Sequence, residues 1–133
     1  MLKSIDLRDY MNPNPMTVKP DANLLDAMEL IIEHKVSGLC VVDEHNHLLG
    51  VLSEMDCLRG VLSATYNESG VGAVSNYMYS DKIITASPHD DIVDVAQDML
   101  LKSHRRRPVV ENGKLVGQVT CRRLLAAVKT FPR

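Results

Sequence analysis

The stretch that decides the fold is Leu39–Asp56, LCVVDEHNHLLGVLSEMD. Two short apolar runs, Leu39–Val42 and Leu48–Leu52, lie on either side of a polar turn, as expected for two neighbouring strands. Ser53 follows the second run at a position typical of a helix N-cap, and Asp56 comes three residues later, the spacing of a capping box. The stretch predicts strand, turn, strand and the start of a helix, whose N-terminal N–H groups favour a carboxylate or a bound phosphate.

The same pattern occurs twice in the chain, at an offset of 67 or 68 residues. LGVLS at 49–53 matches VGQVT at 116–120, and Thr17 and Pro20 match Thr85 and Pro88. Amphipathic helices are predicted over Leu24–Lys35 and Ile92–Ser103, and each half closes with another helix, over Glu54–Leu62 and Cys121–Val128. The sequence therefore predicts an α/β (α+β) fold of two β-α-β-β-α repeats, residues 1–62 and 76–133, joined by a Ser/Gly/Asn-rich linker at 63–75. Because a repeat of about sixty residues buries little surface alone, we expect the two sheets to pack face to face about a pseudo-two-fold axis.

Composition narrows the class of protein. Hydrophobic residues make up 45% and charged residues 24% of the chain, as in globular proteins, and the net charge is −2. This charge gives no general reason to expect a nucleic acid or an anionic membrane as partner. The three cysteines show no CxxC spacing, and neither a secretory leader nor a run long enough to span a membrane is apparent, so we expect free thiols in a cytoplasmic protein.

Both repeats resemble a known family. The matching stretches are YMNPNPMTVKPDANLLDAMELIIEHKVSGLCVVDEHNHLLGVLSEMDCLR and YMYSDKIITASPHDDIVDVAQDMLLKSHRRRPVVENGKLVGQVTCRRLL, and together they look like a tandem pair of cystathionine-β-synthase (CBS) domains, a Bateman module. The resemblance implies a stand-alone regulatory module without catalysis of its own and without a required cofactor. It would bind an adenosine nucleotide (AMP, ADP or ATP), or a related ligand such as S-adenosylmethionine or NAD, in a cleft between the repeats. A homodimer and an unidentified regulated protein are the partners it implies.

The resemblance also assigns a ribose site to Ser53 and Asp56. An ionised carboxylate can accept hydrogen bonds from both cis hydroxyls of a ribose. The alternative is a helix cap alone, worth about 1 kcal/mol. The second repeat has Arg123 where the carboxylate belongs, and because arginine only donates, we expect no equivalent nucleoside site there.

The resemblance also implies that basic residues of the second repeat bind the phosphates: two from the run Lys102–Arg107 before the last strand pair, and one from the helix that follows this pair. Arg105, Arg106 and Arg122 are expected to bind phosphate oxygens, with Arg106 preferred, although a solvated helix end or a nucleic-acid patch would also explain the run. Arg107 aligns with the apolar Leu39 and has no explanation in the sequence. The resemblance further implies base contacts mainly from apolar side chains and backbone of the first repeat: Thr17, Lys19, Ala22, Val36, Ser37, Gly38, Leu39 and Val51.

Other functions have weaker support. No nucleophile elbow or P-loop is present, and the histidines do not converge as a metal site would require, so neither catalysis nor a bound metal is expected. A ligand-free module whose output is dimerisation is the main alternative, and a nucleic-acid-binding regulator comes last.

Overall fold

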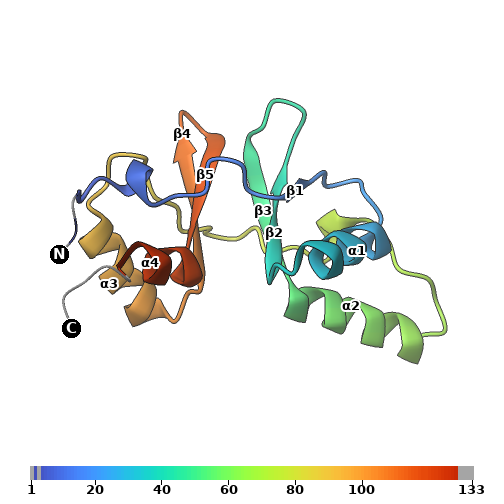
Figure 1. The fold of residues 1–133 in the computed structure, drawn as a ribbon. Helices are drawn as coiled ribbons and strands as arrows, with labels where there is room; N and C mark the ends of the chain where they lie inside the picture. Colours follow the sequence, from blue (N-terminus) through green and yellow to red (C-terminus); the bar gives the residue numbers. More distant parts are fainter. Residues whose placement is uncertain (1, 3, 129–133) are drawn as a thin grey trace. The chain divides into compact units, whose positions relative to one another are not determined.

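The computed structural model describes residue 2 and residues 4–128, which form two compact units. One unit is the continuous stretch Met16–Ile83, and the other combines the segment up to Pro15 with the chain from Ile84 onward. Each unit carries strands and two main helices in the order the repeat predicts (Figure 1).

The Met16–Ile83 unit contains a three-stranded sheet in the order β1-β2-β3. β1 is parallel to β2, and β3 is antiparallel to β2. Its elements are β1 (Thr17–Val18), α1 (Leu24–His34), β2 (Gly38–Val42), β3 (Leu48–Ser53), α2 (Glu54–Tyr66) and η2 (Val74–Asn76).

The other unit repeats this plan with a shorter sheet. The antiparallel pair β4-β5 has a single parallel bridge, Ala86 to Val109, where the first unit has β1. Its elements are η1 (Leu7–Asp9), α3 (Ile92–Lys102), β4 (Arg106–Glu111), β5 (Lys114–Thr120) and α4 (Cys121–Val128).

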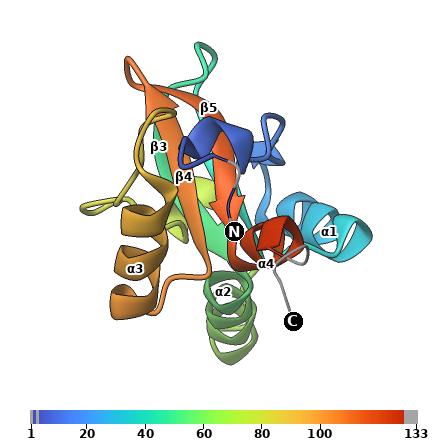
Figure 2. The ribbon, with the colours of Figure 1, turned by 60° about the vertical axis from the view of Figure 1, so that its left-hand side comes forward.

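The first segment of each repeat completes the sheet of the other repeat. Tyr79 and Val51 exchange two backbone hydrogen bonds of 2.9 Å, and Asn12 and Gln118 exchange bonds of 2.8 and 2.9 Å. In Figure 2 the N-terminal segment, in blue, accordingly lies beside β5. The compact units therefore differ from the sequence division at residues 62 and 76, because strand pairing gathers residues that the repeat pattern assigns to different copies.

Local capping explains where the helices begin and end. The side chains of Asn23 and Asp91 accept hydrogen bonds at the N-termini of α1 and α3. Both helices end one residue earlier than predicted, because the residue that follows each of them, Lys35 or Ser103, has a left-handed conformation. α2 runs to Tyr66 rather than Leu62, so the first four residues of the predicted linker are helical. Nothing in that part of the linker breaks a helix, since its first glycine is Gly70.

Each unit has its own aliphatic core. Fully buried residues of the first include Leu24, Leu39, Val41 and Leu52, and those of the second include Leu7, Met99, Val109 and Val119. The cysteines are free, and burial raises the pKa of the Cys57 thiol. Among the described residues, no helix has the length and apolar character required to cross a membrane.

Candidate functional site

Ser53 and Asp56 meet at the N-terminus of α2 as a complete capping box. The Ser53 hydroxyl accepts from the Asp56 N–H at 3.1 Å, and the Ser53 N–H donates to Asp56 Oδ2 at 2.9 Å. The antiparallel register of β2 and β3 brings Ser53 beside Gly38, and Glu54 N–H donates to the Ser37 carbonyl at 3.1 Å. The structure thus gathers the predicted ribose pair and two of the predicted base contacts at one end of the sheet.

The second carboxylate oxygen of Asp56 has a partner that the sequence reasoning missed. Arg59 donates to Oδ1 at 2.6 Å from one turn further along α2. The Asp56 side chain is only 13% exposed, whereas the Arg59 side chain is 65% exposed and solvated. The i, i+3 spacing of an acid and a base on a helix could have signalled this pair. Because the guanidinium end of this ion pair is exposed to water, a ligand hydroxyl could displace Arg59 from Oδ1 at low cost.

The remaining predicted base contacts have other environments. Leu39 is 1% exposed and belongs to the core, and Ala22 and Val36 pack against that core. Lys19 donates through Nζ to the Asp43 carbonyl at 2.9 Å, at the hairpin turn. Thr17 and Val51 are half-buried, and Val51 is held by Tyr79 through the backbone.

The second repeat keeps the helix cap and lacks the carboxylate. Thr120 Oγ1 accepts from Arg123 N–H at 3.1 Å, which reproduces one half of the capping box. Cys121 N–H donates to the Arg105 carbonyl at 3.0 Å, and Arg106 pairs with Thr120 across the sheet. Arg105 and Arg106 therefore lie at the same end of the β4–β5 pair as the start of α4, which carries the exposed Arg122.

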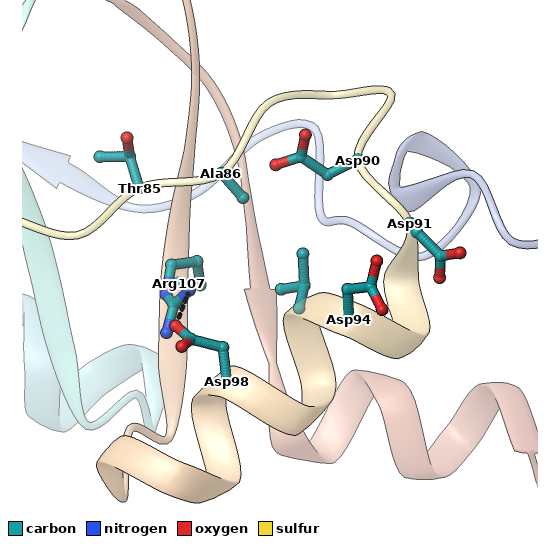
Figure 3. Close-up of a pocket in the computed structure, with 8 residues that line it drawn as sticks. Thr85, Ala86, Asp90, Asp91, Asp94, Asp98 and Arg107 are labelled. Carbon is teal, nitrogen blue, oxygen red and sulfur yellow. Dashed lines mark ion pairs between the residues drawn. The ribbon is translucent and has the colours of Figure 1, made fainter.

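Arg107 forms an ion pair with the half-buried Asp98, and this pair explains the place of Arg107 in the core. Its side chain is 4% exposed, and its Nη1 lies 2.9 Å from Asp98 Oδ2 (Figure 3). Its Nη2 lies 3.3 Å from Nδ1 of His104. Asp98 also accepts from Lys102 at 2.5 Å, and the hydrogen bonds from Lys102 and Arg107 hold the pKa of Asp98 below its usual value against the opposing effect of partial burial. The signal in the sequence was a paired replacement, because Asp98 and Arg107 align with Leu30 and Leu39 of the first repeat.

Histidines pair with aspartates at two places on the surface. His47 Nδ1 lies 3.3 Å from Asp43 Oδ2, and His89 Nδ1 lies 3.0 Å from Asp6 Oδ2. In the part of the chain that the structure describes, no three His, Cys, Asp or Glu side chains are grouped so that they could hold a metal ion.

Comparison with known proteins gives the family. The CBS domain family model matches residues 7–63 and 74–130. Inosine-5'-monophosphate dehydrogenase of Aquifex aeolicus is 33% identical over 118 residues, which cover 87% of this chain and 23% of that protein. Among solved structures, CBSX2 in complex with AMP has 31% identity and a TM-score of 0.85, covering 98% of this chain and 100% of that one.

A more distant structure shows the same fold. The CBS domain pair of protein MJ0100, solved with 5'-methylthioadenosine and S-adenosylmethionine, has 24% identity and a TM-score of 0.76, with 91% and 97% of the two chains covered. The chain spans between 23% and 58% of the length of three curated relatives that it matches. Two matches to one family model, together with the doubled order of strands and helices, show that this chain belongs to the CBS domain family and is a tandem CBS pair.

Proposed function

We propose that this CBS pair is a regulatory module that binds an adenosine nucleotide, with AMP as the first candidate. The observation that carries the proposal is the Ser53–Asp56 pair at the start of α2, a hydroxyl and a carboxylate 13% exposed, which only the first repeat provides. The AMP complex of CBSX2, similar to this chain over nearly its whole length, supports the choice of ligand.

Asp56 can serve the helix and a ribose at once. Oδ2 stays on the Ser53 N–H and keeps the cap, while Oδ1 is free to accept from ribose hydroxyls once Arg59 leaves it. Replacing one charge-assisted hydrogen bond with another makes the exchange nearly balanced in enthalpy, and the released Arg59 regains its side-chain freedom. The ribose would therefore add to the capping box without dismantling it.

Arg105, Arg106 and Arg122 remain the proposed phosphate ligands. Guanidinium groups bind phosphate oxygens bidentately, and the three arginines lie around one end of the β4–β5 pair: just before β4, in β4 and in the first turn of α4. If they act on the ligand, AMP binds more tightly than adenosine, and Arg106→Gln narrows this difference while leaving adenosine affinity unchanged.

A bound nucleotide signals only through a difference in affinity. The ligand stabilises the folded module by mass action. It changes the binding of a regulated protein only if that protein has a different affinity for the nucleotide-bound and the nucleotide-free module. The regulated protein would thus detect ligand occupancy, and the CBS pair itself would carry out no reaction.

Calorimetric titration tests the ribose role. AMP, ADP, ATP, S-adenosylmethionine and NAD are titrated into the parent and into Asp56→Asn, which keeps an oxygen for the Ser53 N–H but loses the charge. We expect Asp56→Asn to weaken AMP binding about tenfold or more, the loss of a charge-assisted bond. Arg59→Ala, which frees Oδ1, should strengthen it about twofold to threefold.

Arg123→Gln is the matched control, because it changes the corresponding position of the second repeat. Its AMP affinity should equal that of the parent. Unchanged affinity in Asp56→Asn would contradict the ribose assignment, and the absence of binding by all five ligands would contradict the proposed function.

A second candidate function, homodimerisation, is favoured by an apolar stripe on α2. Met55, Leu58, Leu62 and Tyr66 follow one another at helical spacing and are 49% to 84% exposed. If a second copy covers the stripe, Leu58→Glu shifts the protein to monomers in sedimentation experiments, whereas Leu100→Glu on α3, also exposed, does not. Dimers that persist in Leu58→Glu would exclude this surface.

A further inference from the structure

A cavity of about 280 Å³ lies between α3, the Ala86 segment and the start of β4, within the unit that contains α3, β4, β5 and α4. Four aspartates line it, Asp90, Asp91, Asp94 and Asp98, together with the guanidinium of Arg107 (Figure 3). With four carboxylates and one guanidinium, the lining carries a formal charge of −3. The cavity is separate from the Ser53–Asp56 site, which belongs to the other unit.

Three of the corresponding positions in the first repeat carry no charged side chain. The positions of Asp90, Asp98 and Arg107 are occupied there by apolar residues: Ala22, Leu30 and Leu39. Leu39 is buried in the first core, and Ala22 and Leu30 pack against that core. The shared fold is therefore stable with an apolar filling here, and the charged lining is a specialisation of the second repeat.

Stability does not account for that specialisation. An ion pair that includes a buried charge, as Arg107 is here, is usually no more stabilising than an apolar pair of similar volume. Arg107 also keeps a buried Nε–H that has no hydrogen-bond partner among the described residues, while its two other nitrogens are engaged by Asp98 and His104. An unpaired buried donor is destabilising, so a ligand that brings an acceptor to this N–H would gain affinity from satisfying it.

The remaining groups determine what else that ligand carries. Asp91 caps α3 through the Val93 N–H and Asp90 accepts from the Ser87 N–H, both at 2.8 Å, whereas no hydrogen bond of the Asp94 carboxylate is found within the described part of the chain. Asp94 is therefore available for an ammonium group. A simple anion would meet the net negative charge, and a simple amine would leave the Arg107 Nε–H unpaired.

We propose that this cavity binds a small zwitterionic amine, whose ammonium group pairs with the aspartates and whose carboxylate accepts from Arg107 Nε–H. Both charges of such a ligand find partners, and the Asp98–Arg107 pair holds the guanidinium in place for the carboxylate. The proposal does not depend on nucleotide binding, since its residues and its ligand class are different.

NMR of the arginine Nε–H groups gives a direct test on the full chain. The probes are ω-amino acids from glycine to 6-aminohexanoate, each compared with the alkylamine and the carboxylate of the same length. We expect at least one ω-amino acid to shift the Arg107 Nε–H resonance saturably and at least about tenfold more tightly than either matched compound, as the loss of one charge-assisted bond predicts. If no ω-amino acid shifts this resonance, or if the matched amine or carboxylate binds as well, the proposal is wrong.

Asp94→Asn and Asp26→Asn form a matched pair of variants, because Asp26 is the corresponding residue of the first repeat. Asp94→Asn should weaken binding of the best probe about tenfold, and Asp26→Asn should leave it unchanged. The double variant Asp98→Leu/Arg107→Leu has the residues of the first repeat at these positions and should not bind the probe. Because it lacks the Arg107 signal, binding is measured through the backbone amide resonances near Ala86 and Val95. Equal binding by Asp94→Asn and the parent, or retained binding by the double variant, would overturn the proposal.

Discussion

Asp98 and Arg107 form an ion pair, 2.9 Å between Oδ2 and Nη1, at the two positions where the first repeat has Leu30 and Leu39. The two side chains are unequally buried, since Asp98 is 33% exposed and Arg107 only 4%. Loss of the acid therefore strands a buried cation, whereas loss of the base leaves an aspartate that water and Lys102 still reach.

The first prediction follows from this asymmetry. Asp98→Leu should lower the melting temperature by roughly 5 to 10 °C, Arg107→Leu by less, and the double variant should melt close to the parent or above it. Calorimetric melting of the four proteins measures the coupling between the two positions. If the double variant instead loses the sum of the stabilities lost by the two single variants, the leucine pair of the first repeat cannot replace the ion pair.

A second prediction concerns pH and the hairpin turn. Asp43 accepts from the backbone N–H groups of His47 and His45, at 2.9 and 2.8 Å, and these bonds, the His47 bond foremost, hold the pKa of Asp43 below its usual value of 3.8. Since the unfolded chain binds this proton more readily, the stabilisation is fully present above pH 3.8 and is lost as pH falls through the lower, folded-state pKa.

The variant Asp43→Asn, whose side chain cannot ionise, tests the direction of this pH dependence of stability. The variant should be less stable than the parent at pH 7, and the difference should shrink below pH 3.8. Urea denaturation at pH 7, 5 and 3 measures it. A difference that stays constant over this range would mean that the carboxylate charge contributes nothing.

The third prediction concerns two glycines at matching positions of the repeats. A Cβ on Gly50 would lie 2.7 Å from Met78 Sδ and 2.9 Å from the Tyr79 carbonyl oxygen, and one on Gly117 would lie 2.6 Å from Met11 Sδ and 2.9 Å from the Asn12 oxygen. Because the oxygens belong to paired backbone, Gly50→Ala and Gly117→Ala should each reduce the free energy of unfolding by about 1–3 kcal/mol. Gly70→Ala, with nothing within 4 Å, is the control, and an equal effect of all three would contradict the packing argument.

A fourth prediction concerns the boundaries of the units. The fragment 16–83 contains every strand and helix of its unit, including Tyr79 against Val51 and the Tyr77 ring beside Gly60. It should therefore unfold cooperatively in urea, while the fragment 1–62, which follows the sequence repeat, should not, because it lacks residues 63–83 of that unit. Cooperative unfolding of 1–62 with the same midpoint would show that the exchanged segment adds no stability.

Comparison of the two repeats within one sequence predicted much of the structure. The order of strands and helices, the amphipathic faces of α1 and α3, and the capping box of Ser53 and Asp56 all follow from spacings of two to four residues. The sequence also shows that Arg123 replaces Asp56 in the second repeat. In the structure this replacement leaves the N-terminus of α4 with one half of the capping box that α2 has.

Long-range partners were not predictable in this way. The pairing of Asn12 with Gln118 and of Tyr79 with Val51 joins short segments with no strong hydrophobic pattern, so local propensity could not reveal it. The i, i+3 spacing of Asp56 and Arg59 is compatible with their ion pair. Sequence seldom specifies such a contact, because the Arg59 side chain is exposed and free to adopt other positions.

The sequence by itself determined the doubled β-α-β-β-α order and the asymmetry of the two repeats at Asp56 and Arg123, because both depend on residue type and periodicity along the chain. Only the tertiary structure decided the roles of Arg107 and of the segments with which each repeat begins. Burial and backbone pairing create those roles, since a guanidinium becomes a core residue only when Asp98 lies against it, and a sheet is completed by whichever segment packs beside its edge.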